Sequence, residues 1–145
     1  MPGKIVNRRA RFDYELGDDL LVGIVLTGRE TKALRQGHGQ LRGAYVTTRN
    51  NELWLANSTI NNGKTFTIDE SEQGRLRKLL ANKKEIAALV AAKEQGRTIV
   101  PLEYLTRTRH IKLKIAVGKG KKRYDKRQDI KKRDQSRDAL RNLKH

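Results

Sequence analysis

The sequence feature that most limits the possible folds is the nearly unbroken apolar run Leu20–Leu26, in a chain otherwise rich in charge. Such a run is typical of a strand that is buried on both faces or that closes a barrel. The chain of 145 residues has the size of one ordinary domain, and its apolar fraction of 36% can support a modest core. Because Leu, Ile and Val recur in short periodic runs, wholesale disorder is not expected.

Two pairs of short segments have the pattern of β-hairpins. Segments 44–48 and 52–60 flank the polar turn Arg49–Asn51, and segments 98–106 and 110–117 follow near the end of the apolar part. The last of these segments alternates, with inward positions predicted at Ile111, Leu113, Ile115 and Val117. The sequence therefore predicts a mainly β fold.

Two helices are predicted between the strands. Thr27 and Glu30 have the spacing of a capping box, and the helix that they begin is expected to end at Gly37. Asn82 and Glu85 repeat the spacing before a second helix that ends at Gly96. Short strands in hairpins, with helices inserted between them, favour a small closed barrel with appended helices, and an OB-type barrel is the leading choice.

Positive charge is unevenly distributed along the chain. Lys and Arg outnumber Asp and Glu by 33 to 16, for a net charge of +17, and residues 118–145 alone carry 12 Lys or Arg against 4 Asp. The apolar residues of this last segment are too few to bury a core, so we expect a body at 1–117 and a basic tail at 118–145. The GKGKK stretch at 118–122 is expected to be a flexible joint.

The tail is expected to be frayed by itself and to become helical when a polyanionic surface orders it. A nonspecific basic extension is an equally good interpretation of its charge.

Catalysis, metal binding and cofactor binding are not expected from this sequence. There is no cysteine, and the three histidines do not have the spacing of metal ligands. The adjacent carboxylates Asp18 and Asp19 are expected in a solvated turn before a strand. No apolar segment resembles a signal peptide or approaches the ~18 residues of a membrane span, so we expect a cytoplasmic protein.

Basic residues gather in three places, at Arg8–Arg11, at Arg75–Lys78 running on to Lys83–Lys84, and in the tail. One such cluster alone is as well explained by a solvated charged face, but three clusters with this net charge indicate a polyanionic partner. Aromatic residues make up only 5% of the chain. The sequence therefore favours recognition of structured RNA by its backbone and shape rather than by base stacking.

Several collinear segments carry a family resemblance across nearly the whole chain. They are Asn7–Arg11, Tyr14–Glu15, Gly23–Gly28 with Glu30, Lys32 and Leu34–Arg35, then Ala44–Val46, Arg77–Leu80, Lys84–Ile86, Val100–Leu102 and Gly118–Arg127. Together they resemble the SsrA-binding protein family, also called small protein B. The most specific segment is GKGKKRYDKR at 118–127, whereas the stretch 61–74 is shorter and more acidic than is usual in the family.

The resemblance implies an OB-fold that binds the tRNA-like domain of tmRNA and delivers it, with elongation factor Tu, to stalled ribosomes. No membrane or small-molecule partner is implied. The expected RNA-binding residues, which include two from the second basic cluster, are Asn7, Arg8, Arg9, Arg11, Glu30, Lys32, Arg77, Lys78, Lys119, Lys121 and Lys122. The tail is expected to act in the mRNA channel and at the small-subunit rRNA of the decoding centre, through Tyr124, Asp125, Lys126 and Arg127.

Plainer explanations stay open at two positions and for the function as a whole. Glu30 completes a capping box, and Asn7 is also explained as a turn residue that positions the strand after it. A structural ribosomal or rRNA-assembly protein with a basic tail fits the composition equally well. A nuclease or RNA-modifying enzyme is disfavoured because no acid–base or ligand cluster is evident.

Overall fold

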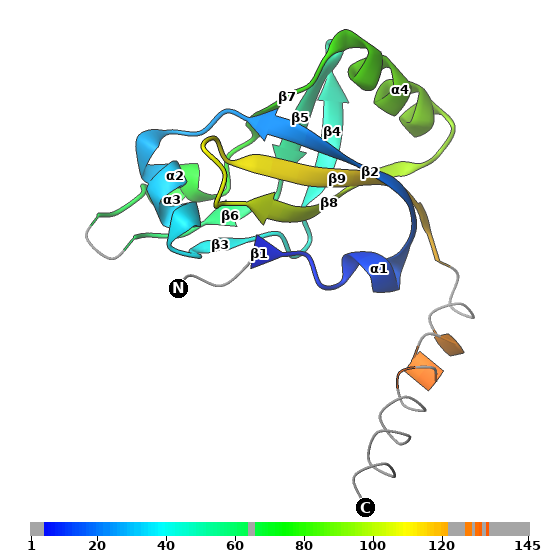
Figure 1. The fold of residues 1–145 in the computed structure, drawn as a ribbon, viewed down its shortest axis with the longest axis horizontal. Helices are drawn as coiled ribbons and strands as arrows, with labels where there is room; N and C mark the ends of the chain where they lie inside the picture. Colours follow the sequence, from blue (N-terminus) through cyan, green and yellow to red (C-terminus); the bar gives the residue numbers. More distant parts are fainter. Residues whose placement is uncertain (1–4, 64–65, 122–126, 129, 132, 134–145) are drawn as a thin grey trace, which may run out of the picture.

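The computed structural model describes residues 5–63, 66–121, 127–128, 130–131 and 133. An antiparallel sheet curls around a single core, with helices on its outside (Figure 1). The main sheet contains β1 (Ile5–Val6), β2 (Tyr14–Ile24), β4 (Tyr45–Arg49), β5 (Glu52–Ala56), β7 (Arg77–Leu80), β8 (Thr98–Leu105) and β9 (Lys112–Gly120). A small second sheet pairs β3 (Gly39–Gln40) with β6 (Thr59–Ile60), and the helices are α1 (Ala10–Asp13), α2 (Gly28–Arg35), α3 (Glu70–Gln73) and α4 (Lys83–Glu94).

The strand order explains why the sheet forms a barrel. It runs β1-β8-β4-β5-β7-β2-β9, and β9 pairs again with β8, which returns the sheet to its own beginning. The ring is not strictly closed, because β4 and β8 are joined by the single pair Val46↔Ile99. The predicted mainly β, OB-type barrel with appended helices is confirmed.

Alternation along the strands places the apolar side chains inside the barrel. In β9, Leu113 and Ile115 are fully buried, while Lys112, the first residue of the strand, is exposed. The predicted hairpin turn is also present, since Asn50 and Asn51 both adopt positive φ angles (50° and 59°) between β4 and β5. Such angles are those of a type I′ turn, which matches the twist of the two strands.

Both predicted capping boxes are confirmed. Thr27 accepts a hydrogen bond from the backbone N–H of Glu30, and Glu30 accepts one from the N–H of Thr27. Asn82 and Glu85 make the equivalent pair at the start of α4. Past the ends of the two helices, Gly37 and Gly96 have φ angles of 82° and 84°, the left-handed conformation that glycine adopts at least cost.

The run Leu20–Leu26 takes the second of its two predicted forms. Its first five residues lie in β2, a strand of the barrel wall between β7 and β9, and Leu21 and Val25 are exposed on the outside of the barrel. The predicted position of the two adjacent carboxylates was wrong. Strand β2 begins six residues earlier, and Asp18 and Asp19 lie within it, at an irregularity in its pairing with β9, rather than in a turn before it. Bulges of this kind place extra residues outside the regular ladder.

Two further differences concern the basic segments. Arg77–Leu80 forms strand β7 between β5 and β2, although the sequence identified it only as a charged cluster. Strand β9 continues beyond Val117, with Gly118 and Gly120 paired to Leu16 and Tyr14 of β2. The first three residues of the expected joint are therefore part of the sheet, and the division into body and tail remains a prediction.

Candidate nucleic-acid interface

The fold brings together two basic segments that are more than a hundred residues apart in the sequence. Strand β2 pairs with the end of β9, so that Glu15 lies opposite Lys119, and the N–H of Lys121 donates to the carbonyl of Asp13 at 2.9 Å. Asp13 ends helix α1, which begins within the cluster at 8–11 and contains Arg11. We call the exposed cations Arg8, Arg9, Arg11 and Lys119, with half-buried Lys121, the α1 cluster.

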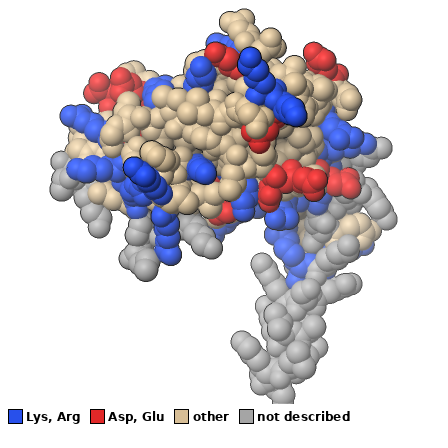
Figure 2. Space-filling view, turned by 45° about the horizontal axis from the view of Figure 1, so that its top comes forward, with Lys and Arg blue, Asp and Glu red and all other residues tan. Residues whose placement is uncertain are grey.

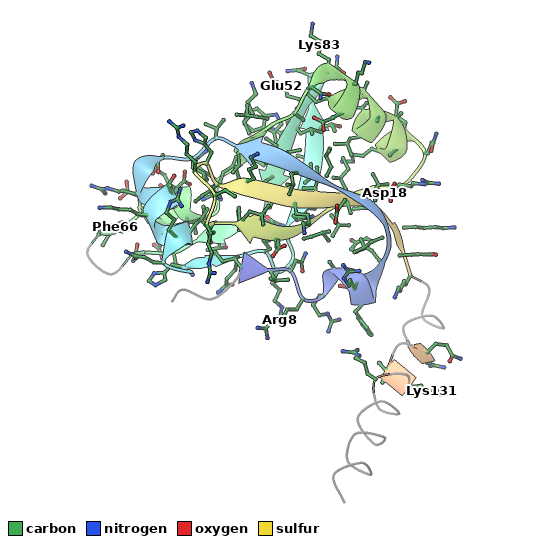
Figure 3. The ribbon with its side chains drawn as sticks, in the orientation of Figure 1. Arg8, Asp18, Glu52, Phe66, Lys83 and Lys131 are labelled. Carbon is green, nitrogen blue, oxygen red and sulfur yellow. The ribbon has the colours of Figure 1, made fainter. Side chains whose placement is uncertain are left out.

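Asn7 positions this cluster by hydrogen bonds to the barrel. Its side-chain amide donates to the carbonyl of Pro101 at 2.9 Å, and its backbone N–H donates to the carbonyl of Leu102 at 2.7 Å. Both acceptors belong to β8, so Asn7 fixes the chain against the barrel just before Arg8 (Figure 3). These bonds support a positioning role for Asn7, although the element after it is helix α1 and not the expected strand.

Phe12 is a residue of this region that sequence reasoning missed. The guanidinium carbon of Arg9 lies 4.7 Å from the centre of the Phe12 ring, and that of Arg133 lies 5.3 Å from it. Both distances are within the range of cation–π attraction. The available signal was an aromatic residue directly after a basic cluster, in a chain with few aromatic residues.

Glu30 and Arg77 form a buried ion pair rather than part of an exposed RNA-binding surface. Glu30 is 1% exposed and Arg77 is 0% exposed, and the Nε of Arg77 donates to Oε2 of Glu30 at 2.7 Å. Arg75 donates to the other carboxylate oxygen at 2.5 Å. The remaining donors of Arg77 bind backbone carbonyls, those of Ser58, Glu72, Gln73 and Arg75.

This arrangement corrects two sequence-based expectations. A guanidinium without exposed surface cannot contact RNA, so the prediction that Arg77 binds RNA directly does not fit the structure. Glu30 does complete the capping box, as its plainer explanation required. Both residues instead tie α2 to β7 and to the segment that contains α3.

The charge state of Glu30 follows from the same contacts. Burial by itself raises the pKa of the Glu30 carboxyl, but hydrogen bonds from Arg75, from the Thr27 N–H and from Arg77, with the charge of Arg77, lower it below its ordinary value. Glu30 is therefore ionised at neutral pH, and its charge is paired. Buried Tyr104 lies nearby, with its hydroxyl 2.6 Å from that of Ser58, and burial raises the pKa of Tyr104 to about 12.

Lys32 and Lys78 lie on other outer parts of the barrel. Lys32 is exposed on α2, and Lys78 is paired with Glu52 at 3.2 Å on neighbouring strands. Two residues beyond Lys78, Leu80 is 51% exposed, and it lies opposite Gly23 of β2. Leu21 is exposed on the same face of β2 as Gly23, so Leu21 and Leu80 form an apolar stripe beside Lys78. The stripe was not predicted, because Leu21 fits a buried strand and Leu80 follows a charged cluster in the sequence.

The remaining predicted tail residues lie mostly outside the described part of the chain. These are Lys122, Tyr124, Asp125 and Lys126. Arg127 is described; it is helical and exposed, as is Lys131 a turn later (Figure 3).

The described residues do not hold a cluster of three or more histidines or carboxylates suited to a metal ion. None of the helices in the described ranges is long and apolar enough to cross a membrane. On the face shown in Figure 2, most of the surface belongs to residues that are neither basic nor acidic, Lys and Arg gather at the left with further groups elsewhere, and a row of acidic residues lies at the lower right.

The fold and these clusters define a basic, OB-type barrel protein, a class of barrel that commonly binds nucleic acids. The sequence model of the SmpB protein family matches residues 4–145, and this chain belongs to that family.

Individual relatives agree with this assignment. The chain is 48% identical over 140 residues to an SsrA-binding protein of Paracoccus denitrificans, with 95% of this chain and 90% of the relative covered. It is 43% identical over 148 residues to an SsrA-binding protein of Lysinibacillus sphaericus, with 98% and 94% covered. A solved structure described as tmRNA-SmpB in the bacterial ribosome matches with a TM-score of 0.69 and 33% identity, covering 88% of this chain and 94% of that one.

Proposed function

We propose that this chain binds the tRNA-like domain of tmRNA and delivers it to stalled ribosomes for trans-translation. Elongation factor Tu would bind through the tmRNA complex, and delivery to the ribosome would take place in the cytoplasm. In this proposal the chain is a binding and delivery factor, and no residue carries out a chemical step. Family membership and the tmRNA-SmpB neighbour support the proposal.

The observation that carries the proposal is the assembly of the α1 cluster at the point where the tail leaves the barrel. Pairing of β2 with β9 joins Arg8, Arg9 and Arg11 to Lys119 and Lys121 in one basic area. Phosphate groups are bound by such clusters because each contact releases condensed counterions. The outer apolar stripe at Leu21 and Leu80 adds a surface that a nucleoside can cover.

The tail would act separately from the barrel, in the decoding centre and the empty mRNA channel. Tyr124, Asp125, Lys126 and Arg127 would contact small-subunit rRNA there. A tail that follows β9 on the RNA-bound side of the barrel would let one molecule hold tmRNA and contact the ribosome together.

A competition binding experiment tests the first part. Labelled tRNA-like domain is bound to the full chain at ~150 mM salt and displaced by ordinary tRNA or by a random hairpin. Strong preference for the tRNA-like domain supports the proposal. Equal displacement by unlabelled tRNA-like domain, by ordinary tRNA and by the hairpin would instead favour a structural ribosomal or rRNA-assembly protein.

Truncation tests the division between barrel and tail. Because β9 pairs with β2 as far as Gly120, the chain should be cut after Lys121 rather than after Val117. We expect this variant to keep most of its affinity for the tRNA-like domain and to lose peptide tagging on stalled ribosomes. Loss of both activities in a folded variant would contradict the division.

A further inference from the structure

We propose that the loop between β8 and β9 is an additional contact for the phosphate backbone of the RNA bound by the barrel, and that Arg35 positions it. The loop contains Arg107 and Arg109, which separate the predicted strand segments 98–106 and 110–117. This inference rests on the proposed function, because it names a further part of the same RNA interface.

Arg35 holds this loop through its backbone. From the last turn of α2, its Nη1 donates to the carbonyl of Thr106 at 2.7 Å, and its Nη2 donates to the carbonyls of Thr108 and Arg109 at 3.2 and 3.0 Å. The two elements lie side by side at one end of the barrel (Figure 1). A planar guanidinium with a fixed fork of donors suits such a set of acceptors, whereas a lysine cannot reproduce it.

A threonine inside the loop reinforces the same conformation. The hydroxyl of Thr108 lies 3.3 Å from the carbonyl of Leu105 and 2.5 Å from that of His110. The backbone of the loop is therefore held from two directions while Arg107, Arg109 and His110 stay exposed. A loop already ordered in the free protein loses less entropy when its side chains bind a ligand.

The charge around the loop is positive. We define the loop patch as Lys32 of α2, Arg107, Arg109 and Lys112 of β9, all four of which are exposed. Within residues 28–35 and 105–112 the sequence has a single acidic residue, Glu30, which is 1% exposed and already paired. In Figure 2, Lys and Arg atoms gather at the left, on the side of the molecule where α2 and this loop lie.

The loop patch is continuous with the outer face proposed to bind RNA. Lys112 lies opposite Gly23 of β2, and Gly23 lies opposite exposed Leu80 of β7. An RNA strand that covers the apolar stripe would therefore have the cations of the loop patch at the end of that stripe. A single guanidinium group can bind two phosphate oxygens through two parallel hydrogen bonds, which makes RNA backbone the fitting partner for Arg107 and Arg109.

The test compares two double substitutions that remove the same charge. Arg107→Gln/Arg109→Gln removes the cations of the loop, and Arg42→Gln/Arg49→Gln removes two exposed cations elsewhere, one just before β4 and one at its end. Binding of the labelled tRNA-like domain of tmRNA is measured by fluorescence anisotropy over a series of salt concentrations. Circular dichroism confirms that each variant is folded at the assay temperature.

We expect the loop substitution to raise the Kd about tenfold and to make the slope of log K against log salt shallower by about 1.5, the value for two lost phosphate contacts. The control should leave the slope unchanged, because long-range charge alone does not remove a contact. If the two variants behave alike, or if only binding to isolated small ribosomal subunits is weakened, the inference is overturned. Failure of the unsubstituted chain to bind this RNA would instead reject the proposed function itself.

The positioning role of Arg35 has its own readout. Arg35→Met should weaken RNA binding and flatten the salt slope as the loop substitution does, and adding it to Arg107→Gln/Arg109→Gln should cause no further loss. Arg35→Lys, which keeps the charge but not the fork, should restore only part of the affinity. Full additivity of the two losses, or a normal slope in folded Arg35→Met or Arg35→Lys, would show that Arg35 does not act through the loop.

Discussion

Removal of the Glu30 carboxylate should cost this protein much of its stability. Glu30→Ala would leave the Arg77 guanidinium, which is 0% exposed, without its counter-charge, and it would remove the acceptor for the Thr27 N–H. Breaking a buried ion pair from one side costs about 3–5 kcal/mol. Because Arg77 keeps its carbonyl acceptors, we expect the lower part of that range for the pair, with about 1 kcal/mol more for the lost capping bond.

The expected total of about 4–5 kcal/mol is a large share of the ~5–15 kcal/mol by which a domain is ordinarily stable. Urea unfolding followed by circular dichroism measures it, with Glu52→Gln as the control. The Glu52–Lys78 pair has half-exposed side chains and should contribute no more than about 1 kcal/mol. If Glu30→Ala proves as mild as Glu52→Gln, the argument that burial makes this ion pair important is refuted.

The stability of the protein at acid pH should also depend on the Glu30 carboxylate. The pKa of Glu30 is lowered in the folded chain from an ordinary value of 4.5, so the unfolded chain binds the proton more tightly. The stabilisation from this carboxylate is therefore complete above pH 4.5 and is lost as the pH falls from there through the folded pKa. In Glu30→Gln that component of the acid dependence should be absent; an unchanged profile would contradict the assignment.

Three further changes test other parts of the fold. Burial raises the pKa of Tyr104 from 10.0 to about 12. Stability that is present below pH 10.0 should therefore be lost as the pH rises through 12, by about 2–3 kcal/mol. Urea unfolding at alkaline pH should show no such loss for Tyr104→Phe. Asn51→Gly relieves a positive φ of 59° and should raise the free energy of unfolding by about 0.5–1 kcal/mol, whereas Asn51→Val should lower it. A Cβ on Gly118 would lie 3.0 Å from that of Tyr14, so Gly118→Ala should lower the melting temperature, with a cost of about 1–3 kcal/mol; an unchanged melting temperature would argue that β9 ends before Gly118.

Local signals in the sequence predicted the elements whose interactions lie close together along the chain. Each capping box joins residues three positions apart, so Thr27 with Glu30 could be identified without knowledge of the fold. The β4–β5 turn is equally local, because its two asparagines set the backbone by themselves. Barrel class and basic character followed from periodicity and net charge in the same way.

The candidate interface was less predictable, because its residues meet only through strand pairing. Arg75–Lys78 has the composition of a charged surface, yet β7 lies between two strands and turns Arg77 toward Glu30, 47 positions earlier in the chain. The exposure of Leu21 was missed for a related reason. An apolar run does not reveal which of its faces the rest of the barrel will cover.

By itself, the sequence determined the family, the mainly β barrel, the ends of the two capped helices α2 and α4, and the net positive charge, but not the short helices α1 and α3. The tertiary structure alone decided which charges are available to a partner: it buried Glu30 with Arg77, joined Arg8–Arg11 to Lys119, and fixed Arg107 and Arg109 beside α2 through Arg35. The physical reason is that burial and ion pairing depend on contacts between residues far apart in the chain. Only the folded arrangement of the strands establishes those contacts.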